Sequence, residues 1–279
     1  MQTFSAPAKL NLFLHVVGRR PDGYHLLQTV FRLLDFYDQI DLEVRDDGVI
    51  NLITPLQNVP AEQDLCVRAA RLLQTESGTQ LGVDIALHKN IPMGGGLGGG
   101  SSDAATMLMA LNELWHLNWE NSRLQALGLK LGADVPVFIF GENAFAEGVG
   151  EQLSALSLPQ AWYLIIVPPV HVSTAEIFSN KELTRNTIPI TIPPFSIWDG
   201  HNDLEPVVCS LYPEVYRSLE WLKHLENTRI TAMSGSGACV FSEFATESEA
   251  NAALAGLPAD MRGFVVRGLD RHPMRCAKP

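Results

Sequence analysis

The sequence has little positive charge, and this absence limits what the protein can bind. Its 279 residues include 20 Lys and Arg against 31 Asp and Glu, which gives a formal net charge of −11. Broad binding to nucleic acid or to an anionic membrane needs a basic surface, so both are disfavoured. A phosphorylated small molecule is not excluded, because the backbone N–H groups at a helix N-terminus can bind phosphate. We therefore expect small-molecule ligands, and nothing in the sequence indicates an obligate protein partner.

Cysteine pairs, a secretory leader and long apolar runs are also lacking. The scattered cysteines are Cys66, Cys209, Cys239 and Cys276. They form no C-x-x-C pair and have no histidine at metal spacing, which predicts reduced thiols in a cytoplasmic protein. The first 20 residues have no basic segment, and Lys9, Asn11 and His15 interrupt their apolar part, so we expect no secretory signal. No run approaches the ~18 apolar residues of a membrane span.

The sequence contains a mixture of alternating and helical patterns. Period-two alternation and β-branched runs predict strands at 10–15, 48–54, 81–90, 162–169 and 263–269, a strand pair within 27–45 and another within 229–244. Helical spacing predicts helices at 64–78, 101–117, 121–132, 213–227 and 246–257, the last with a capping box at Thr246 and Glu249. The 186–200 segment is rich in proline and predicts a long loop. The element order favours an α+β fold of two domains, 1–155 and 156–279.

The stretch 92–105, PMGGGLGGGSSDAA, is the most unusual part of the chain. Gly94, Gly96 and Gly99 fit the G-x-G-x-x-G dinucleotide fingerprint, but the strand before them alternates, whereas a buried parallel strand is continuously apolar. A Walker A loop needs a Lys before its Ser or Thr, and this loop has none. A plain flexible linker would not explain why the glycines run directly into a helix that opens on Ser-Ser-Asp.

A phosphate cradle of another kind fits the stretch better. Glycines let several backbone N–H groups converge on an anion, and the helix dipole adds partial positive charge. Ser101 or Ser102 would add a hydroxyl contact. Asp103 would repel a triphosphate, so we expect it to face away from the phosphates or to act through a bound metal.

Four blocks of the sequence, in the same order, resemble the GHMP kinases. The segment PMGGGLGGGSSDAA is similar to their second motif, with extra glycines and with Asp103 before the alanines. PAKLNLFLHVVGRRPDGYH (7–25) resembles their first motif in the form found in members that act on a diphosphocytidyl substrate. MSGSGACVF (233–241) resembles the third motif, and LGADVPVFIFGENAFAEGVGE (131–151) is also similar to that subgroup.

This resemblance implies a fold and an activity. The N-terminal ATP domain would be ribosomal-protein-S5-like, the C-terminal domain ferredoxin-like, and the active site would lie in the cleft between them. The reaction would transfer phosphate from ATP, with Mg²⁺, to the 2-hydroxyl of diphosphocytidyl-methylerythritol in non-mevalonate isoprenoid precursor synthesis. Two alternatives remain open: another GHMP kinase of the homoserine or mevalonate type, or a catalytically inactive nucleotide-binding regulator.

The same resemblance implies roles for particular residues. Asp134 matches the catalytic base and Lys9 its partner lysine. The ATP contacts would be Lys89, Pro92, Met93, Gly94, Gly95, Gly96, Leu97, Gly98, Gly99, Gly100, Ser101 and Ser102. The substrate contacts would be Asn11, Tyr24, His25, Thr174 and Phe178, with the aromatic rings and His25 binding cytosine. Ser234, Gly235, Ser236 and Gly237 would close over phosphates from the second domain.

Two points stay open at this level. Related kinases often have Asn where this chain has Asp64, so a contact between Asp64 and the adenine is in doubt. The metal ligands are undetermined, because no acidic cluster marks a protein cage and Ser101, Asp103 and Asp134 are all candidates.

Overall fold

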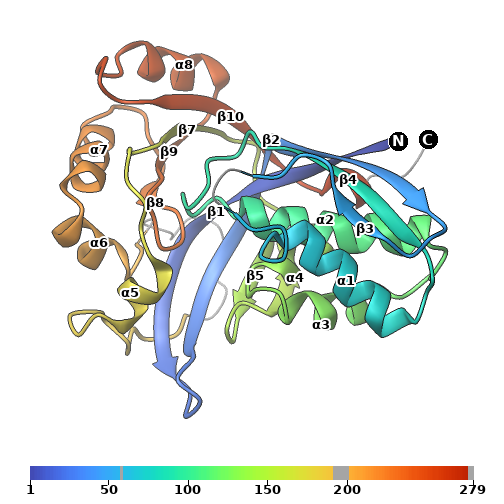
Figure 1. Cartoon of the computed structure of the whole chain (residues 1–279). Coiled ribbons are helices and arrows are strands. Elements are labelled where there is room, and N and C mark those ends of the chain that lie inside the picture. The colour runs from blue at the N-terminus through green and yellow to red at the C-terminus, as the bar shows by residue number, and fades with distance from the viewer. Residues whose placement is uncertain (57–58, 191–200, 276–279) are drawn as a thin grey trace.

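The computed structural model describes residues 1–56, 59–190 and 201–275. Within these residues the strands form one continuous sheet of ten strands, with the central order β3-β4-β2-β10-β7-β9-β8. Figure 1 shows the sheet running through the whole molecule, with α1 to α4 beneath one end and α5 to α7 at the other. The fold is therefore α+β, as the sequence predicts.

The longest elements are the first two strands, β1 (Gln2–Arg19) and β2 (His25–Arg45), which pair antiparallel along almost their whole length. The residues between them, RPDGY, form a turn in which Gly23 has a φ of 93°. The register of the pair shifts between Pro7 and Lys9 and again between Asn11 and Leu14. These irregularities bend the strands next to the residues that carry Lys9 and Asn11.

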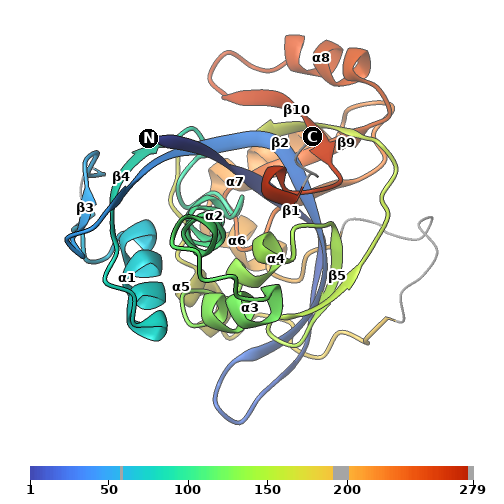
Figure 2. The same cartoon turned by 90° about the vertical axis from the view of Figure 1, so that its right-hand side faces the viewer.

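The first half of the chain adds short strands and four helices to this pair. The strands are β3 (Ile50–Leu52), β4 (Gly82–His88), β5 (Ala144–Glu147) and β6 (Gln152–Ala155). The helices are α1 (Leu65–Ser77), α2 (Gly99–Leu114), α3 (Asn121–Leu129) and α4 (Val135–Phe140). Figure 2 shows α2 nearly end-on, with α1, α3 and α4 around it and the sheet above.

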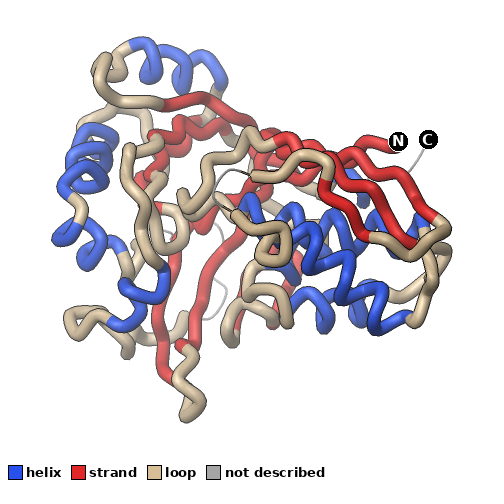
Figure 3. Tube along the Cα trace, in the orientation of Figure 1, coloured by secondary structure: helices blue, strands red, loops and turns tan. Residues whose placement is uncertain are grey.

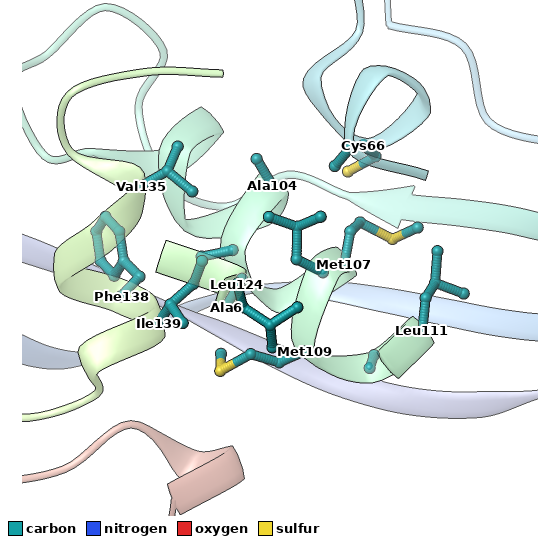
Figure 4. Packing of buried hydrophobic residues seen from close by; sticks show 14 of the residues in the cluster. Ala6, Cys66, Ala104, Met107, Met109, Leu111, Leu124, Val135, Phe138 and Ile139 are labelled. Atoms are coloured by element: carbon teal, nitrogen blue, oxygen red, sulfur yellow. The ribbon is translucent and has the colours of Figure 1, made fainter. Parts of the chain in front are cut away.

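Helix α2 is central because nearly all of its side chains are apolar or small. Every residue from Ser102 to Leu111 is buried. Figure 4 shows Met107 and Leu111 of α2 in the same cluster as Leu124 of α3 and Ile139 of α4. Because α2 is clamped on several sides, its N-terminus and the glycine loop before it are held in a fixed place.

The second half begins with β7 (Trp162–Ile166) and continues with α5 (Thr174–Ser179), α6 (Glu205–Leu211) and α7 (Pro213–Lys223). It ends with β8 (Thr231–Met233), β9 (Val240–Phe244), α8 (Glu247–Ala255), β10 (Gly263–Leu269) and a 3₁₀ turn, Pro273–Arg275. Strand β10 pairs with both β7 and β2, so it joins the two halves of the sheet. The predicted domain boundary at 155 stays a prediction; β6 ends there, and an extended segment leads to β7.

Several local predictions differ from the structure for identifiable reasons. Residues 27–45 form part of one strand, not a strand pair, because β1 lies opposite them without interruption by a turn. The helix predicted at 121–132 ends at Leu129, before Gly132. Helix α4 was not predicted, since its sequence VPVFIF is apolar throughout and has no period. Part of the predicted 186–200 loop, residues 191–200, lies outside the described residues.

Two other expectations are confirmed. The capping box of Thr246 and Glu249 opens α8. Cys66, Cys209 and Cys239 are free thiols, and Cys276 lies outside the described residues. The dinucleotide fold that Gly94, Gly96 and Gly99 alone would allow is wrong, because β4 pairs antiparallel with β2 instead of belonging to a doubly wound parallel sheet.

Candidate active site

A cavity of about 680 Å³ lies between the two halves of the molecule. Its walls come from β1, the glycine loop, the start of α4, the segment before α5 and the 235–237 loop. In Figure 3 the tan loops gather in the middle of the molecule, between the two groups of helices. Segments far apart in the sequence therefore meet at one place, which is the usual position of a ligand site between domains.

The glycine loop is held by backbone contacts on both of its sides. The backbone N–H of Lys9 in β1 donates to the Leu97 carbonyl at 2.9 Å. From the other half of the chain, the N–H of Cys239 donates to the Gly95 carbonyl at 3.1 Å, and the Ser234 hydroxyl donates to the Gly96 carbonyl at 2.8 Å. Through these hydrogen bonds the glycine loop connects β1 to the 234–239 loop.

These contacts explain why the loop needs glycine. Gly96 has a φ of 75°, and a Cβ atom there would lie 2.1 Å from the Ser234 carbonyl oxygen. Gly98 has a φ of 73°, and its Cβ would lie 3.0 Å from two carbon atoms of the Lys9 side chain. Both the backbone conformation and the close approach of neighbouring atoms exclude a side chain at these two positions.

Lys9 and Asp134, predicted as catalytic partners, lie together at the cavity wall. The Lys9 Nζ is 3.2 Å from the Asp134 Oδ2. The lysine is almost fully buried, whereas the aspartate side chain is 36% exposed. Lys9 also donates to the Oδ1 of Asn11, whose Nδ2 donates to the Thr29 hydroxyl at 2.9 Å. The ammonium is therefore fixed from two sides, and the carboxylate faces the cavity.

Lys89 forms a second buried ion cluster beneath the glycine loop. Its Nζ pairs with Asp38 and, at 2.7 Å, with the Oδ2 of Asp103. Asp38 also accepts the backbone N–H groups of Asn90 and Ile91, so it anchors the segment that leads into the loop. The Asp103 Oδ1 is buried without a hydrogen-bond partner among the described residues.

The cluster shifts the pKa of both Asp103 and Lys89. Burial raises the pKa of Asp103 to about 7; the Asp38 carboxylate adds to this rise, and Lys89 offsets part of it. Burial by itself lowers the pKa of Lys89, but the two carboxylates outweigh it and the pKa is raised. Asp103 lines the cavity but is already paired with Lys89, so its charge is largely compensated within the protein.

An adjoining hollow of about 520 Å³ contains the predicted cytosine contacts Tyr24, His25 and Phe178. The rings of His25 and Phe178 lie 4.9 Å apart between centroids, tilted by 31°. Tyr24 is 64% exposed at the rim. Burial lowers the pKa of His25, and the charges of Arg185 and Arg19 lower it further. The imidazole therefore favours its neutral form.

The remaining predicted residues fall into two groups. Thr174 begins α5, and its hydroxyl lies 2.7 Å from that of Ser236, so the second-half loop contacts the start of this helix. Ser101, Gly235 and Gly237 also line the main cavity. Leu97, Ser102 and Ser234 are buried and are not among the lining residues.

Asp64 lines the cavity but has a structural role of its own. Its side chain caps α1 by accepting the backbone N–H groups of Cys66 and Val67. A carboxylate at this position is thus accounted for without a nucleotide.

Sequence reasoning missed two residues that the structure brings to the site. His171 lines the main cavity, and a Cβ atom at Gly94 would lie 2.4 Å from its Nδ1. Arg185 donates to His25 from outside the hollow. Neither residue lies in a glycine-rich or periodic pattern, so no local signal could have identified them.

Across the described ranges, no group of three or more His, Cys, Asp or Glu side chains is arranged to hold a metal ion. Within the same ranges, no helix is long and apolar enough to cross a membrane.

Comparison with known proteins identifies the family. Residues 64–142 match the GHMP kinases N terminal domain, and residues 196–263 match the GHMP kinases C terminal domain. A 4-diphosphocytidyl-2-C-methyl-D-erythritol kinase from Nitrosospira multiformis is 70% identical over 96% of this chain and 92% of its own length. The chain is a GHMP kinase. Members of this family are ATP-dependent small-molecule kinases, so the protein is an enzyme that uses ATP as co-substrate.

Further relatives support the same placement. The 4-diphosphocytidyl-2-C-methyl-D-erythritol kinase of Thiobacillus denitrificans is 62% identical over 98% of this chain and 97% of its own. A crystal structure of 4-(cytidine 5'-diphospho)-2C-methyl-D-erythritol kinase superposes with a TM-score of 0.81 at 34% identity, covering 96% of this GHMP kinase and 99% of that chain. A mevalonate kinase structure, with a TM-score of 0.70 at 14% identity over 97% of this chain and 100% of its own, shares the fold.

Proposed function

We propose that this GHMP kinase transfers the γ-phosphate of ATP to the 2-hydroxyl of 4-diphosphocytidyl-2-C-methyl-D-erythritol, a step in non-mevalonate isoprenoid precursor synthesis. The observation that carries this proposal is the near-full-length identity with kinases that bear this substrate in their names. The hollow of Tyr24, His25 and Phe178 supports it, because a homoserine or mevalonate kinase needs no pocket for a cytosine ring.

Asp134 is the proposed general base. Its carboxylate, beside the Lys9 ammonium at the cavity wall, accepts the proton of the substrate hydroxyl as the oxygen attacks the γ-phosphorus. The P–O bond to ADP breaks as the new bond forms, and ADP leaves with the electron pair. The buried Lys9 orients the carboxylate and offsets the negative charge that develops around the transferred phosphoryl group.

The glycine loop and the N-terminus of α2 are the proposed site of the ATP phosphates. Lys89, Pro92 to Gly100 and Ser101 would surround them, and Ser234 to Gly237 would approach from the other half of the chain. The backbone N–H groups of this loop suit phosphate oxygens. The Ser102 hydroxyl is buried, does not line the cavity and has no hydrogen-bond partner among the described residues, so we do not propose it as a phosphate contact.

Mg²⁺ would accompany ATP and neutralise phosphate charge when bound. Ser101 and Asp134 at the cavity wall, together with the unpartnered Oδ1 of Asp103, would supply the protein oxygen ligands to such an ion. A few oxygen donors fit an ion that keeps its own waters and is bound mostly through the phosphates.

The substrate would lie across the cavity, with cytosine between the rings of Tyr24 and Phe178, His25 at the edge of the base, and the 2-hydroxyl of the methylerythritol near Asp134. Thr174, which lines both the cavity and the hollow, and Asn11 would be polar contacts to the substrate. Stacking on an aromatic ring contributes about 1–3 kcal/mol per base. The cytoplasmic location expected from the sequence stays a prediction.

A substrate panel tests the function directly. Purified protein with labelled ATP is given diphosphocytidyl-methylerythritol, homoserine or mevalonate, and transfer of label to each is measured. We expect transfer to the first alone. Transfer to homoserine or mevalonate would favour the alternative kinases, and absence of any transfer would favour an inactive nucleotide-binding regulator.

The variant Asp134→Ala tests the mechanism. Loss of a general base lowers the rate by roughly 10²–10⁴-fold, so we expect kcat to fall by this factor while ATP affinity changes little. The matched control is Asp260→Ala, which removes an exposed carboxylate that pairs with Arg217 away from the cavity. Turnover of Asp134→Ala close to that of the control would refute the assignment.

A further inference from the structure

Arg185 is tied to the backbone around α5 and to His25 at the same time. Its Nη2 donates to the carbonyls of Phe178 and Asn180, at 3.0 and 2.6 Å, and its Nη1 donates to the Leu183 carbonyl at 3.0 Å. A fourth N–H, that of Nε, is directed at the His25 Nε2 at 3.1 Å. The three carbonyl contacts fix the plane of the guanidinium, and so fix where the fourth hydrogen bond points.

The identity of the donor determines the protonation of His25. A guanidinium has only N–H donors and does not lose its proton in proteins. The His25 Nε2 must therefore accept, which is incompatible both with the imidazolium and with the tautomer that carries its proton on Nε2. The proton of the neutral ring then lies on Nδ1. The lowered pKa of His25, caused first by burial and then by Arg185 and Arg19, agrees with a neutral ring.

We propose that Arg185 is a positioning residue that holds His25 as the Nδ1–H tautomer, and that this tautomer makes the hollow selective for cytosine over uracil. The inference rests on the proposed function, because it deepens the role of the same hollow. No contact to the His25 Nδ1 is found among the described residues, so this N–H is available to a ligand. Phe178, whose carbonyl accepts a hydrogen bond from Arg185, also places its ring next to that of His25.

The selectivity follows from the hydrogen-bonding groups of the two bases. Cytosine has an acceptor at ring N3, whereas uracil has an N–H donor there. An Nδ1–H donor of His25 can pair with N3 of cytosine, but it would face the N3–H donor of uracil. Stacking alone cannot separate the two bases, since every base has a π face. A donor that the bound base covers and leaves unpaired weakens binding by about 10- to 100-fold, and this is the discrimination we expect.

The first measurement is the tautomer itself. Protein labelled with ¹⁵N-histidine gives distinct ring-nitrogen shifts for protonated and unprotonated nitrogens, and His25→Gln assigns the His25 signals by their loss. We expect the wild-type signals to be those of the Nδ1–H form at neutral pH. In Arg185→Met, which has no donor, the ring should move to a mixture containing the Nε2–H form. Arg217→Met, at an exposed ion pair away from the hollow, should leave the signals unchanged.

The second measurement is binding of cytidine diphosphate and uridine diphosphate by calorimetry, with ADP saturating so that the ATP site is occupied. Wild type and Arg217→Met should prefer the cytidine ligand by about 10- to 100-fold, and Arg185→Met should lose most of this ratio. Arg185→Lys keeps a donor and should recover part of it. If Arg185→Met fails to fold, the wild-type spectrum and Arg185→Lys still decide.

The outcomes separate this inference from the proposed function. A wild-type His25 in the Nε2–H form overturns the inference, whatever the enzyme phosphorylates. A wild type that phosphorylates diphosphocytidyl-methylerythritol but binds both diphosphates equally also overturns it and leaves the proposed function intact. An Nδ1–H ring with a cytidine preference but without phosphoryl transfer supports the inference and contradicts the proposed function.

Discussion

Gly98→Ala tests whether the glycine loop controls the position of Lys9. Gly98 precedes α2 with a φ of 73°, and a Cβ there would lie 2.9 Å from the Phe138 ring and 3.0 Å from Lys9 Cε and Cγ. Gly78 offers a matched control, because it has a φ of 71° at the end of α1 and nothing within 4 Å of its Cβ position. The two substitutions therefore share the backbone strain and differ in the contacts.

The expected magnitudes follow from this difference. Alanine in the left-handed region costs about 1–2 kcal/mol, and restriction of the unfolded chain returns about 0.4–1 kcal/mol. Gly78→Ala should thus lose roughly 0–1.6 kcal/mol of unfolding free energy. Gly98→Ala adds overpacking against the Phe138 ring and the Lys9 side chain, which costs about 1–3 kcal/mol more. A displacement of Lys9 by ~1 Å would lower kcat by about 10²-fold.

The assay is denaturant unfolding of both variants together with steady-state kinetics. We expect Gly78→Ala to keep wild-type kcat and Gly98→Ala to lose both stability and turnover. Equal unfolding free energies and equal kcat values in the two variants would refute the reasoning that the Lys9 side chain fills the space above Gly98.

Three other predictions concern histidine and aspartate side chains. His25→Ala should raise the KM for the cytidine substrate far more than the KM for ATP, and equal effects in steady-state kinetics would contradict the cytosine assignment. Asp103 has a folded-state pKa of about 7, above the unfolded value of about 3.9, so its contribution to stability is lost as pH rises between these values. The free energy of unfolding of Asp103→Asn, compared with that of the wild type, should therefore rise by on the order of 1–3 kcal/mol between pH 5 and pH 8. Burial lowers the pKa of His272 to about 3, so the unfolded chain binds its proton first as pH falls below about 6.5. Denaturant unfolding at pH 4 and pH 7 should show that the free energy of unfolding falls less on acidification in His272→Gln than in the wild type. An equal fall in both proteins would exclude His272 as the cause of the acid destabilisation.

Much of the fold could be predicted from the sequence, because its signals are local. The amphipathic spacing of 64–78 predicted α1, the capping pair at Thr246 predicted the start of α8, and the glycines before Ser101 predicted a loop entering a helix. Helix α4 could not be predicted from its pattern, since a short run that is buried on all sides has no polar face to mark its period.

The candidate site could be predicted only in part from the sequence. The ordered motifs pointed to Lys9 and Asp134, but composition and spacing could not tell how close they lie. The connection between Gly96 and Ser234 spans 138 residues and became visible only in the fold. Arg185 gave no signal, because its role depends on three carbonyl groups whose positions the helix α5 and its following turn determine.

The sequence by itself determined the family and the α+β class, because both depend on motifs and patterns of neighbouring residues along the chain. Only the tertiary structure decided which charges are paired. From the sequence, Asp103 could either face away from the phosphates or bind a metal. In the structure it pairs with Lys89, which also pairs with Asp38. Ion pairing in a buried cluster depends on distances between separate elements, and those are fixed by how β2, the segment after β4 and α2 pack.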